Sequence, residues 1–134
     1  MSIPRKKIEV VAAVIRQDST ILCVQRPEND KKYISKKWEF PGGKVELNES
    51  LHAALQREIE EELALEIRVC DLIQVVQHAY PDFDLTMHVF FCDLLRGDLI
   101  LREHIDYRWL PVSKLSALDW AAADVPIVEE LCKS

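Results

Sequence analysis

The chain has 134 residues, of which 49% are hydrophobic and 30% are charged, a composition typical of one folded domain rather than of a disordered or fibrous chain. Its formal net charge of −6 argues against the basic face that broad binding to a nucleic acid polymer requires. Because no apolar run approaches the length of a membrane span or a signal peptide, we expect one cytoplasmic domain, residues 1–134, with no membrane partner.

The first elements in chain order are two short runs rich in β-branched residues. Residues 8–15 and residues 21–24 flank the turn-forming pair Asp18-Ser19, and this pattern predicts a β-hairpin. Residues 27–37 are polar, are the most basic stretch of the chain, and suit an exposed loop. A short strand at residues 38–40 is expected next, and Pro41-Gly42-Gly43 should break it into a turn.

An amphipathic helix is expected after this turn. Asn48 or Ser50 can cap its N-terminus, because both side chains can accept a hydrogen bond from the first helical N–H groups. Apolar residues recur at the three- and four-residue spacing of a helix: Leu51, Ala54, Leu55, Ile59 and Leu63.

The remainder of the chain predicts further strands and one more helix. Strands are expected at residues 67–78, 85–95 and 108–110, with a turn at residues 96–98, and a helix is expected at residues 121–132. Strands, a central helix, more strands and a terminal helix predict an α+β fold with a mixed sheet covered by helices, rather than a helix bundle or a pure β-barrel.

The central helix carries a cluster of carboxylates. At 100° per residue, Glu58, Glu61 and Glu62 share an arc of about 100°, whereas Glu60 points elsewhere. Such neighbours repel by roughly 0.2–0.5 kcal/mol per pair, and no cation follows one turn later. Mg²⁺ is the natural partner, since it prefers hard oxygen ligands and bridges carboxylates to substrate phosphates. The alternative is a solvated acidic helix face.

Residues 43–65, GKVELNESLHAALQREIEEELAL, resemble the Nudix box, which reads Gly, five residues, Glu, seven residues, Arg-Glu, an aliphatic, any residue, Glu-Glu, any residue, Gly and an aliphatic. The matching positions are Gly43, Glu49, Arg57, Glu58, Ile59, Glu61, Glu62 and Leu65. Ala64 stands where the family has Gly. We expect Ala64 to extend the helix or to strain its terminal turn by about 1 kcal/mol, without removing a ligand.

The resemblance extends to the MutT-like branch, because Trp38-Glu39-Phe40-Pro41-Gly42-Gly43-Lys44 is similar to its strand and turn before the box. Similarity covers most of residues 8–132. It implies a Nudix α/β/α sandwich with a central mixed β-sheet and the box on a loop-helix-loop. It also implies Mg²⁺-dependent hydrolysis of a nucleoside triphosphate to the monophosphate and pyrophosphate, with Mn²⁺ as a possible substitute.

The same resemblance assigns roles to particular residues. The carbonyl of Gly42 and the carboxylates of Glu58, Glu61 and Glu62 would bind metal, while Arg57 would orient the carboxylates and Glu49 would support the loop. Glu103 stands six residues before Trp109, which matches an additional glutamate of the branch. It is a candidate metal ligand or general base for the attacking water, its alternative being an idle surface glutamate.

Four residues are candidates for binding the substrate. Arg26 could contact phosphate, or it could be an exposed arginine at a strand end. Lys44 closes the segment similar to the MutT-like branch. Phe40 and Asp124 correspond to positions that line the base pocket in that branch, and Asp124 lies in an Ala-Asp-Val-Pro segment similar to the CTP pyrophosphohydrolase subgroup.

Asp124 leaves the choice of base open. If its carboxylate is ionised, Asp124 only accepts hydrogen bonds and fits the amino group of cytosine. If it is protonated, Asp124 can also donate a hydrogen bond, and an oxidised purine becomes acceptable. The third alternative is that Asp124 is a simple helix cap. We therefore expect a pyrophosphohydrolase for CTP, dCTP or modified pyrimidine nucleotides. The alternatives are an 8-oxo-dGTP diphosphatase and, less favoured, an ADP-ribose pyrophosphatase or a non-catalytic nucleotide sensor. The expected assembly is a monomer or homodimer with a small-molecule partner.

Overall fold

The computed structural model describes residues 5–133. Its strands, in chain order, are β1 (Lys6–Gln17), β2 (Thr20–Gln25), β3 (Trp38–Glu39), β4 (Gly42–Lys44), β5 (Glu66–Ala79), β6 (Phe83–Arg96) and β7 (Asp106–Leu110). Its helices are α1 (Leu51–Leu63), the 3₁₀ helices η1 (Val112–Ala117) and η2 (Ala122–Asp124), and α2 (Val125–Cys132).

The strands form one mixed sheet. Its main order is β3-β2-β1-β6-β5, while β4 pairs with β1 and β7 pairs with β2. Strand β1 runs parallel to β6 and antiparallel to β2 and β4. The predicted α+β fold with a central mixed sheet is therefore confirmed.

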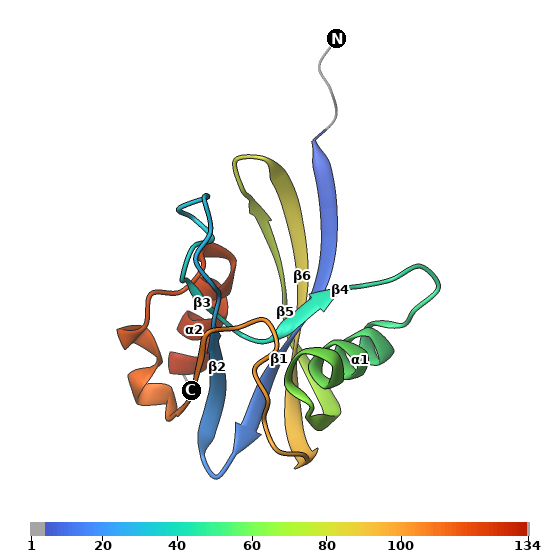
Figure 1. Cartoon of the computed structure of the whole chain (residues 1–134), viewed down its shortest axis with the longest axis vertical. Coiled ribbons are helices and arrows are strands. Elements are labelled where there is room, and N and C mark those ends of the chain that lie inside the picture. Colours follow the sequence, from blue (N-terminus) through green and yellow to red (C-terminus); the bar gives the residue numbers. More distant parts are fainter. Residues whose placement is uncertain (1–4, 134) are drawn as a thin grey trace.

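Helices cover both faces of this sheet (Figure 1). Along β1, Val11, Ala13 and Ile15 pack with the buried side of α1, whereas Ala12 and Val14 pack in the cluster that includes α2. Successive residues of a strand point to opposite faces, so a continuous apolar run is what a strand buried on both faces requires. Two apolar layers result, one on each side of the sheet, which is the predicted α/β/α sandwich.

Helix α1 has well-defined ends. The Ser50 side chain accepts a hydrogen bond from the Ala53 N–H, so Ser50 rather than Asn48 is the cap. At the other end Ala64 adopts a left-handed conformation with φ of 57°, and its N–H donates to the Glu60 carbonyl. Ala64 thus ends the helix as glycine does in the box, at a strain of about 1 kcal/mol, and does not extend it.

The predicted turn at Gly42 and Gly43 is wrong, because both residues belong to strand β4, which pairs with β1. Glycine is required at these two positions for a different reason. A Cβ on Gly42 would lie 1.9 Å from the Val11 carbonyl oxygen, and a Cβ on Gly43 would lie 2.3 Å from the Glu58 carboxyl group. Close approach of neighbouring atoms, rather than a turn, excludes a side chain at both positions.

The C-terminal segment also differs from its prediction. The α-helix begins at Val125 with a proline in its first turn, and residues 122–124 form the short 3₁₀ helix η2. Helix η1 was not predicted, because its six residues carry no distinct helical period. Within residues 5–133, no helix has the length and apolar character needed to cross a membrane.

Candidate functional site

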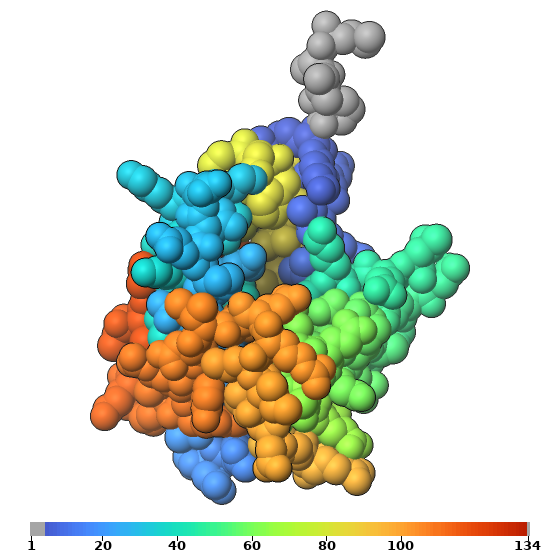
Figure 2. Space-filling model, in the orientation of Figure 1, coloured from blue at the N-terminus to red at the C-terminus, as the bar shows by residue number. Residues whose placement is uncertain are grey.

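A pocket of about 630 Å³ opens on one side of the sheet. The surface is hollowed between the loop after β2, the β5–β6 hairpin and the segment before β7 (Figure 2). Seven predicted substrate or metal residues line it: Arg26, Phe40, Gly42, Lys44, Glu62, Glu103 and Asp124. Residues that lie far apart in the sequence therefore meet around one cavity.

Arg57 organises the box carboxylates outside this pocket. Its guanidinium donates to both carboxylate oxygens of Glu49, at 2.7 and 2.9 Å, to Glu58 at 2.9 Å and to Glu61 at 3.1 Å. It also donates to the Lys44 carbonyl at 3.0 Å, which ties helix α1 to strand β4. Because of this guanidinium, the pKa of Glu49 is lowered to about 2. Arg57 is thus a cation of the cluster, and it lies one turn before Glu61, its i,i+4 neighbour on the helix, rather than one turn after the carboxylates.

The three helix carboxylates predicted to bind metal do not face the same space. Glu62 lines the pocket, Glu58 lies against Gly43, and Glu61 borders a separate surface hollow beside Arg57. The Glu61 side chain is 60% exposed, whereas that of Glu58 is 14% exposed. The helical arc predicted from the sequence therefore brings the carboxylates near one another but leaves only Glu62 pointing into the pocket.

Glu62 carries a carboxylate oxygen that is not hydrogen-bonded within residues 5–133. Its Oε2 atom is buried and has no hydrogen-bond partner in the described part of the chain. Burial raises the pKa of Glu62 to about 8, and the charges of Glu103 and Glu58 add to the effect. An unpartnered buried carboxylate oxygen beside other carboxylates is costly unless a cation or a proton neutralises it.

Glu103 reaches the pocket because the chain before it is fixed to helix α1. The Arg102 N–H donates to the Glu62 carbonyl at 3.3 Å, and the Arg102 guanidinium donates to the Glu61 carbonyl at 2.7 Å. On the other side, the Ile105 N–H donates to the Gln25 carbonyl at 3.0 Å. Glu103, although exposed on one side, is therefore held at the pocket edge near Glu62.

The oxygen atoms at this site are of the kind that binds a divalent cation, but they are not arranged around one point. Carboxylate and carbonyl oxygens are the ligands that Mg²⁺ prefers, and the unpartnered Glu62 oxygen lies among them. Between residues 5 and 133, however, no three His, Cys, Asp or Glu side chains converge closely enough to hold a metal ion as they stand. Arg57 donates to one oxygen of Glu58 and to one oxygen of Glu61, which leaves the second oxygen of each carboxylate outside the hydrogen bonds of Arg57.

The raised pKa of Glu62 predicts how metal-free stability depends on pH. The folded protein retains a proton on Glu62 that the unfolded chain releases, so stability should fall as pH rises from the ordinary glutamate range to about 8. Added Mg²⁺ competes with this proton, and its stabilising effect should therefore grow over the same range. Thermal unfolding with and without Mg²⁺, at about pH 6 and about pH 8, measures both effects. Stabilisation by Mg²⁺ that does not change with pH would contradict the assignment.

The sequence interpretation missed two residues of the pocket, Glu39 and His104. Glu39 accepts hydrogen bonds from Arg26 at 3.2 Å and from His104 at 2.9 Å. Arg26 is therefore neither free nor merely exposed; its Nε atom is buried without a hydrogen-bond partner among the described residues. The available signals were a lone charge between the buried aromatics Trp38 and Phe40, and a histidine directly after Glu103.

Asp124 is a buried acidic residue in the core, with 4% of its surface exposed. It occupies the cap position of α2 but makes no side-chain cap hydrogen bond; instead its Oδ1 accepts from the Phe40 N–H at 3.0 Å. The simple helix-cap interpretation is therefore wrong. Burial raises the pKa of Asp124 well above its ordinary range, with a further contribution from the charge of Glu39. Burial therefore opposes the ionised form of Asp124, while the hydrogen bond from the Phe40 N–H acts in the other direction.

Comparisons with known proteins agree with this geometry. The NUDIX domain model matches residues 6–131. The chain is 37% identical to the CTP pyrophosphohydrolase of Escherichia coli K12 over 92% of its own length and 90% of the relative. It is 35% identical to the 8-oxo-dGTP diphosphatase of Proteus vulgaris over 71% of its length and 84% of the relative.

Among solved structures, the MutT protein of Methanosarcina mazei Go1 superposes with a TM-score of 0.86 at 27% identity, covering 98% of this chain and 97% of the other. The family model spans nearly all the described residues, and Glu62 of the box lines the pocket together with Glu103. The chain therefore belongs to the Nudix family and is a hydrolase of its MutT-like branch.

Proposed function

We propose that the chain hydrolyses nucleoside triphosphates to the monophosphate and pyrophosphate, with a preference for CTP, dCTP or a modified pyrimidine nucleotide. The observation that carries the proposal is one pocket with two chemically distinct ends: the unpartnered Glu62 oxygen near Glu103, and the buried Asp124 beside Phe40. The first end suits phosphates with a cation, and the second suits the polar edge of a base. The similarity to a CTP pyrophosphohydrolase supports the pyrimidine.

The residues at the phosphate end of the pocket would have different roles in hydrolysis. Glu62, Glu58, Glu61 and the Gly42 carbonyl would hold Mg²⁺, or Mn²⁺ in its place, while Arg57 keeps the helix carboxylates in position. The bound cation would supply neutralisation of phosphate charge and a more acidic water. Glu103, at the pocket edge, would accept the proton of the attacking water through its carboxylate. Lys44 and Arg26 would contribute positive charge toward the phosphates.

A second candidate, 8-oxo-dGTP hydrolysis, is supported by the raised pKa of Asp124. A neutral carboxyl group both donates and accepts, so it can pair with the amino group and ring nitrogen of cytosine, or with the carbonyl and N–H edge of an oxidised guanine. An ionised Asp124 would only accept and would favour cytosine. The similarity to an 8-oxo-dGTP diphosphatase points the same way.

A panel of CTP, dCTP, 5-substituted dCTP, dGTP, 8-oxo-dGTP and ADP-ribose, assayed with Mg²⁺, tests the proposal. We expect the highest kcat/KM for a cytosine nucleotide, with pyrophosphate as the second product. Preferred cleavage of ADP-ribose would replace the proposal with the nucleotide-sugar alternative. Binding of a nucleotide without any hydrolysis would identify a sensor.

Asp124→Asn separates the two protonation states of Asp124. Asparagine donates and accepts at every pH, whereas Asp124 loses its donor as pH rises through its pKa. In the wild type, the kcat/KM ratio of 8-oxo-dGTP to CTP should therefore fall as pH rises. In the variant it should stay constant, and above the pKa the two proteins should differ by about tenfold, the usual value of one base contact. Parallel profiles in both proteins would remove Asp124 from base recognition.

A further inference from the structure

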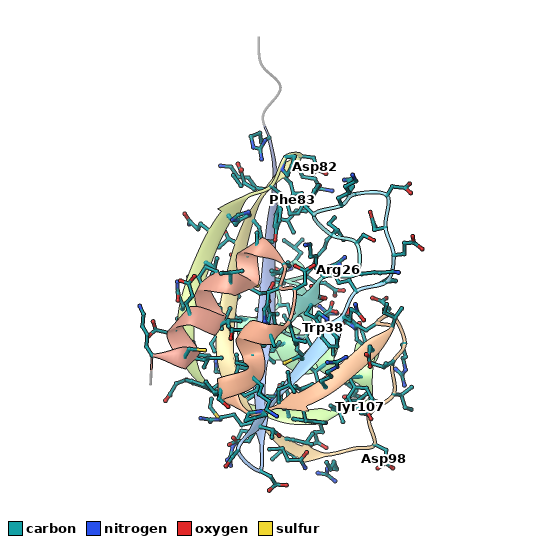
Figure 3. The ribbon with its side chains drawn as sticks, turned by 90° about the vertical axis from the view of Figure 1, so that its left-hand side faces the viewer. Arg26, Trp38, Asp82, Phe83, Asp98 and Tyr107 are labelled. Carbon is teal, nitrogen blue, oxygen red and sulfur yellow. The ribbon has the colours of Figure 1, made fainter. Side chains whose placement is uncertain are left out.

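Glu39 is held in a fixed position on the wall of the pocket. The Arg26 guanidinium donates to its Oε1 at 3.2 Å and His104 contacts its Oε2 at 2.9 Å. Only 19% of the Glu39 side chain is exposed, and only 5% of the His104 side chain. In the view of Figure 3, Arg26 lies between Phe83 and Trp38, the residue that precedes Glu39. A carboxylate held from both sides presents its remaining lone pairs in a defined direction.

The surroundings of Glu39 locate it between the two ends of the pocket. On one side its chain neighbour Phe40 donates to Asp124 at 3.0 Å. On the other side its partner His104 is the chain neighbour of Glu103, which lies near Glu62. The negative charge of Glu39 also contributes to the raised pKa of both Asp124 and Glu62, as expected for a group between them. A nucleotide with its base at Asp124 and its phosphates at Glu62 would lay its sugar along Glu39.

The chemistry at this position calls for hydrogen-bond donors. An ionised Glu39 can only accept hydrogen bonds. Because His104 donates to Glu39 through Nε2, the Nδ1 atom of a neutral His104 ring carries no proton and is also an acceptor. That Nδ1 is buried and has no partner among residues 5–133. Phosphates offer no donor at neutral pH and would be repelled by the carboxylate, whereas a sugar hydroxyl donates to either acceptor.

We infer that Glu39 is a specificity-determining residue that accepts a hydrogen bond from a sugar hydroxyl of the nucleotide, with Arg26 and His104 as its positioning residues. The inference rests on the proposed function, because it concerns the same pocket and the same class of substrate. It assigns recognition of a sugar hydroxyl, the 2′-OH or the 3′-OH, to a residue outside the Nudix box.

The experiment compares CTP with its 2′-deoxy and 3′-deoxy analogues in the wild type, in Glu39→Ala and in Glu39→Gln. In the wild type, kcat/KM should fall about tenfold for the analogue that lacks the recognised hydroxyl, as expected when a hydrogen bond to a charged group is lost. In Glu39→Ala, CTP and that analogue should be used within about twofold of each other. Glu39→Gln keeps shape and a neutral acceptor, so it should show an intermediate penalty.

The matched control is Glu9→Ala. Glu9 also pairs with a histidine, since its Oε2 lies 3.0 Å from Nε2 of His88, but it is not part of the pocket wall. This variant should keep the wild-type penalty for the deoxy analogue. UTP provides a further arm, because it lacks the amino group of cytosine but keeps both hydroxyls.

Several outcomes would overturn the inference. These are a wild type that uses all three cytidine nucleotides within about twofold, an unchanged deoxy penalty in Glu39→Ala, and a Glu39 variant that alters the CTP-to-UTP ratio instead. The wild-type comparison and Glu39→Gln decide the matter even if Glu39→Ala does not fold. Failure of the proposed function would look different, since the wild type would then release no pyrophosphate from any of these nucleotides.

Discussion

Replacing Glu62 by Gln should lower kcat for Mg²⁺-dependent hydrolysis by at least about 100-fold, equivalent to roughly 2.7 kcal/mol of activation free energy. Glutamine keeps nearly the same shape but carries no charge. Glu62 is the helix carboxylate that lines the pocket and has a buried oxygen without a partner in the described chain, so its charge should be directed at the cation. Steady-state kinetics at saturating Mg²⁺ measures the effect.

The same substitution should make the metal-free protein more stable. Burial and neighbouring carboxylates raise the pKa of Glu62 to about 8, so at and above this pH the folded state carries an unfavourable charge that glutamine removes. Glu60→Gln on the exposed side of the same helix is the control, and it should change neither property. Near-normal kcat in Glu62→Gln, or an equal loss in Glu60→Gln, would contradict the role of Glu62.

Adding one methyl group at Gly42 or Gly43 should have two different consequences. A Cβ on Gly42 would meet backbone atoms of β1, at 1.9 Å from the Val11 carbonyl oxygen and 2.8 Å from the Ala12 Cα. Backbone in a paired strand cannot yield without breaking the pairing, so Gly42→Ala should lower the free energy of unfolding by about 3 kcal/mol or more.

In Gly43→Ala the atoms that clash belong to the Glu58 carboxyl group, the mobile end of a side chain. That group can move, but it then leaves the position in which Arg57 holds it at 2.9 Å. We expect Gly43→Ala to lower kcat by about 100-fold while costing only about 1 kcal/mol of stability. Urea unfolding and kinetics on both variants measure the contrast. A fully active Gly43→Ala would show that the position of Glu58 is unimportant.

Much of the fold could be predicted because the local patterns agree with the final packing. The apolar run of β1 alternates between two covered faces, and the apolar positions of α1 follow one helical side. The box spacing then places Arg57 and the glutamates on that helix without further information. The 3₁₀ helix η1 could not be predicted, since so short a segment has no period of its own.

Several features of the candidate site could not be predicted from the sequence, because they depend on contacts that only the folded chain forms. Why Gly42 and Gly43 must be glycine depends on β1 and Glu58, atoms that only the fold brings within reach. The pairing of Glu39 with His104 joins residues 65 positions apart. Whether Asp124 accepts or donates depends on its burial, and a cap position in the sequence does not reveal that its side chain turns to Phe40.

The most direct test of the central claim is product analysis of CTP hydrolysis by ³¹P NMR in ¹⁸O-enriched water. With Mg²⁺, the wild type should yield CMP and pyrophosphate, with the label in one of these products, and chelation of the metal should stop the reaction. The phosphate end of the pocket, with Glu62 and Glu103, is what makes this cleavage expected. Release of CDP and inorganic phosphate, or turnover that persists after chelation, would contradict a metal-dependent pyrophosphohydrolase.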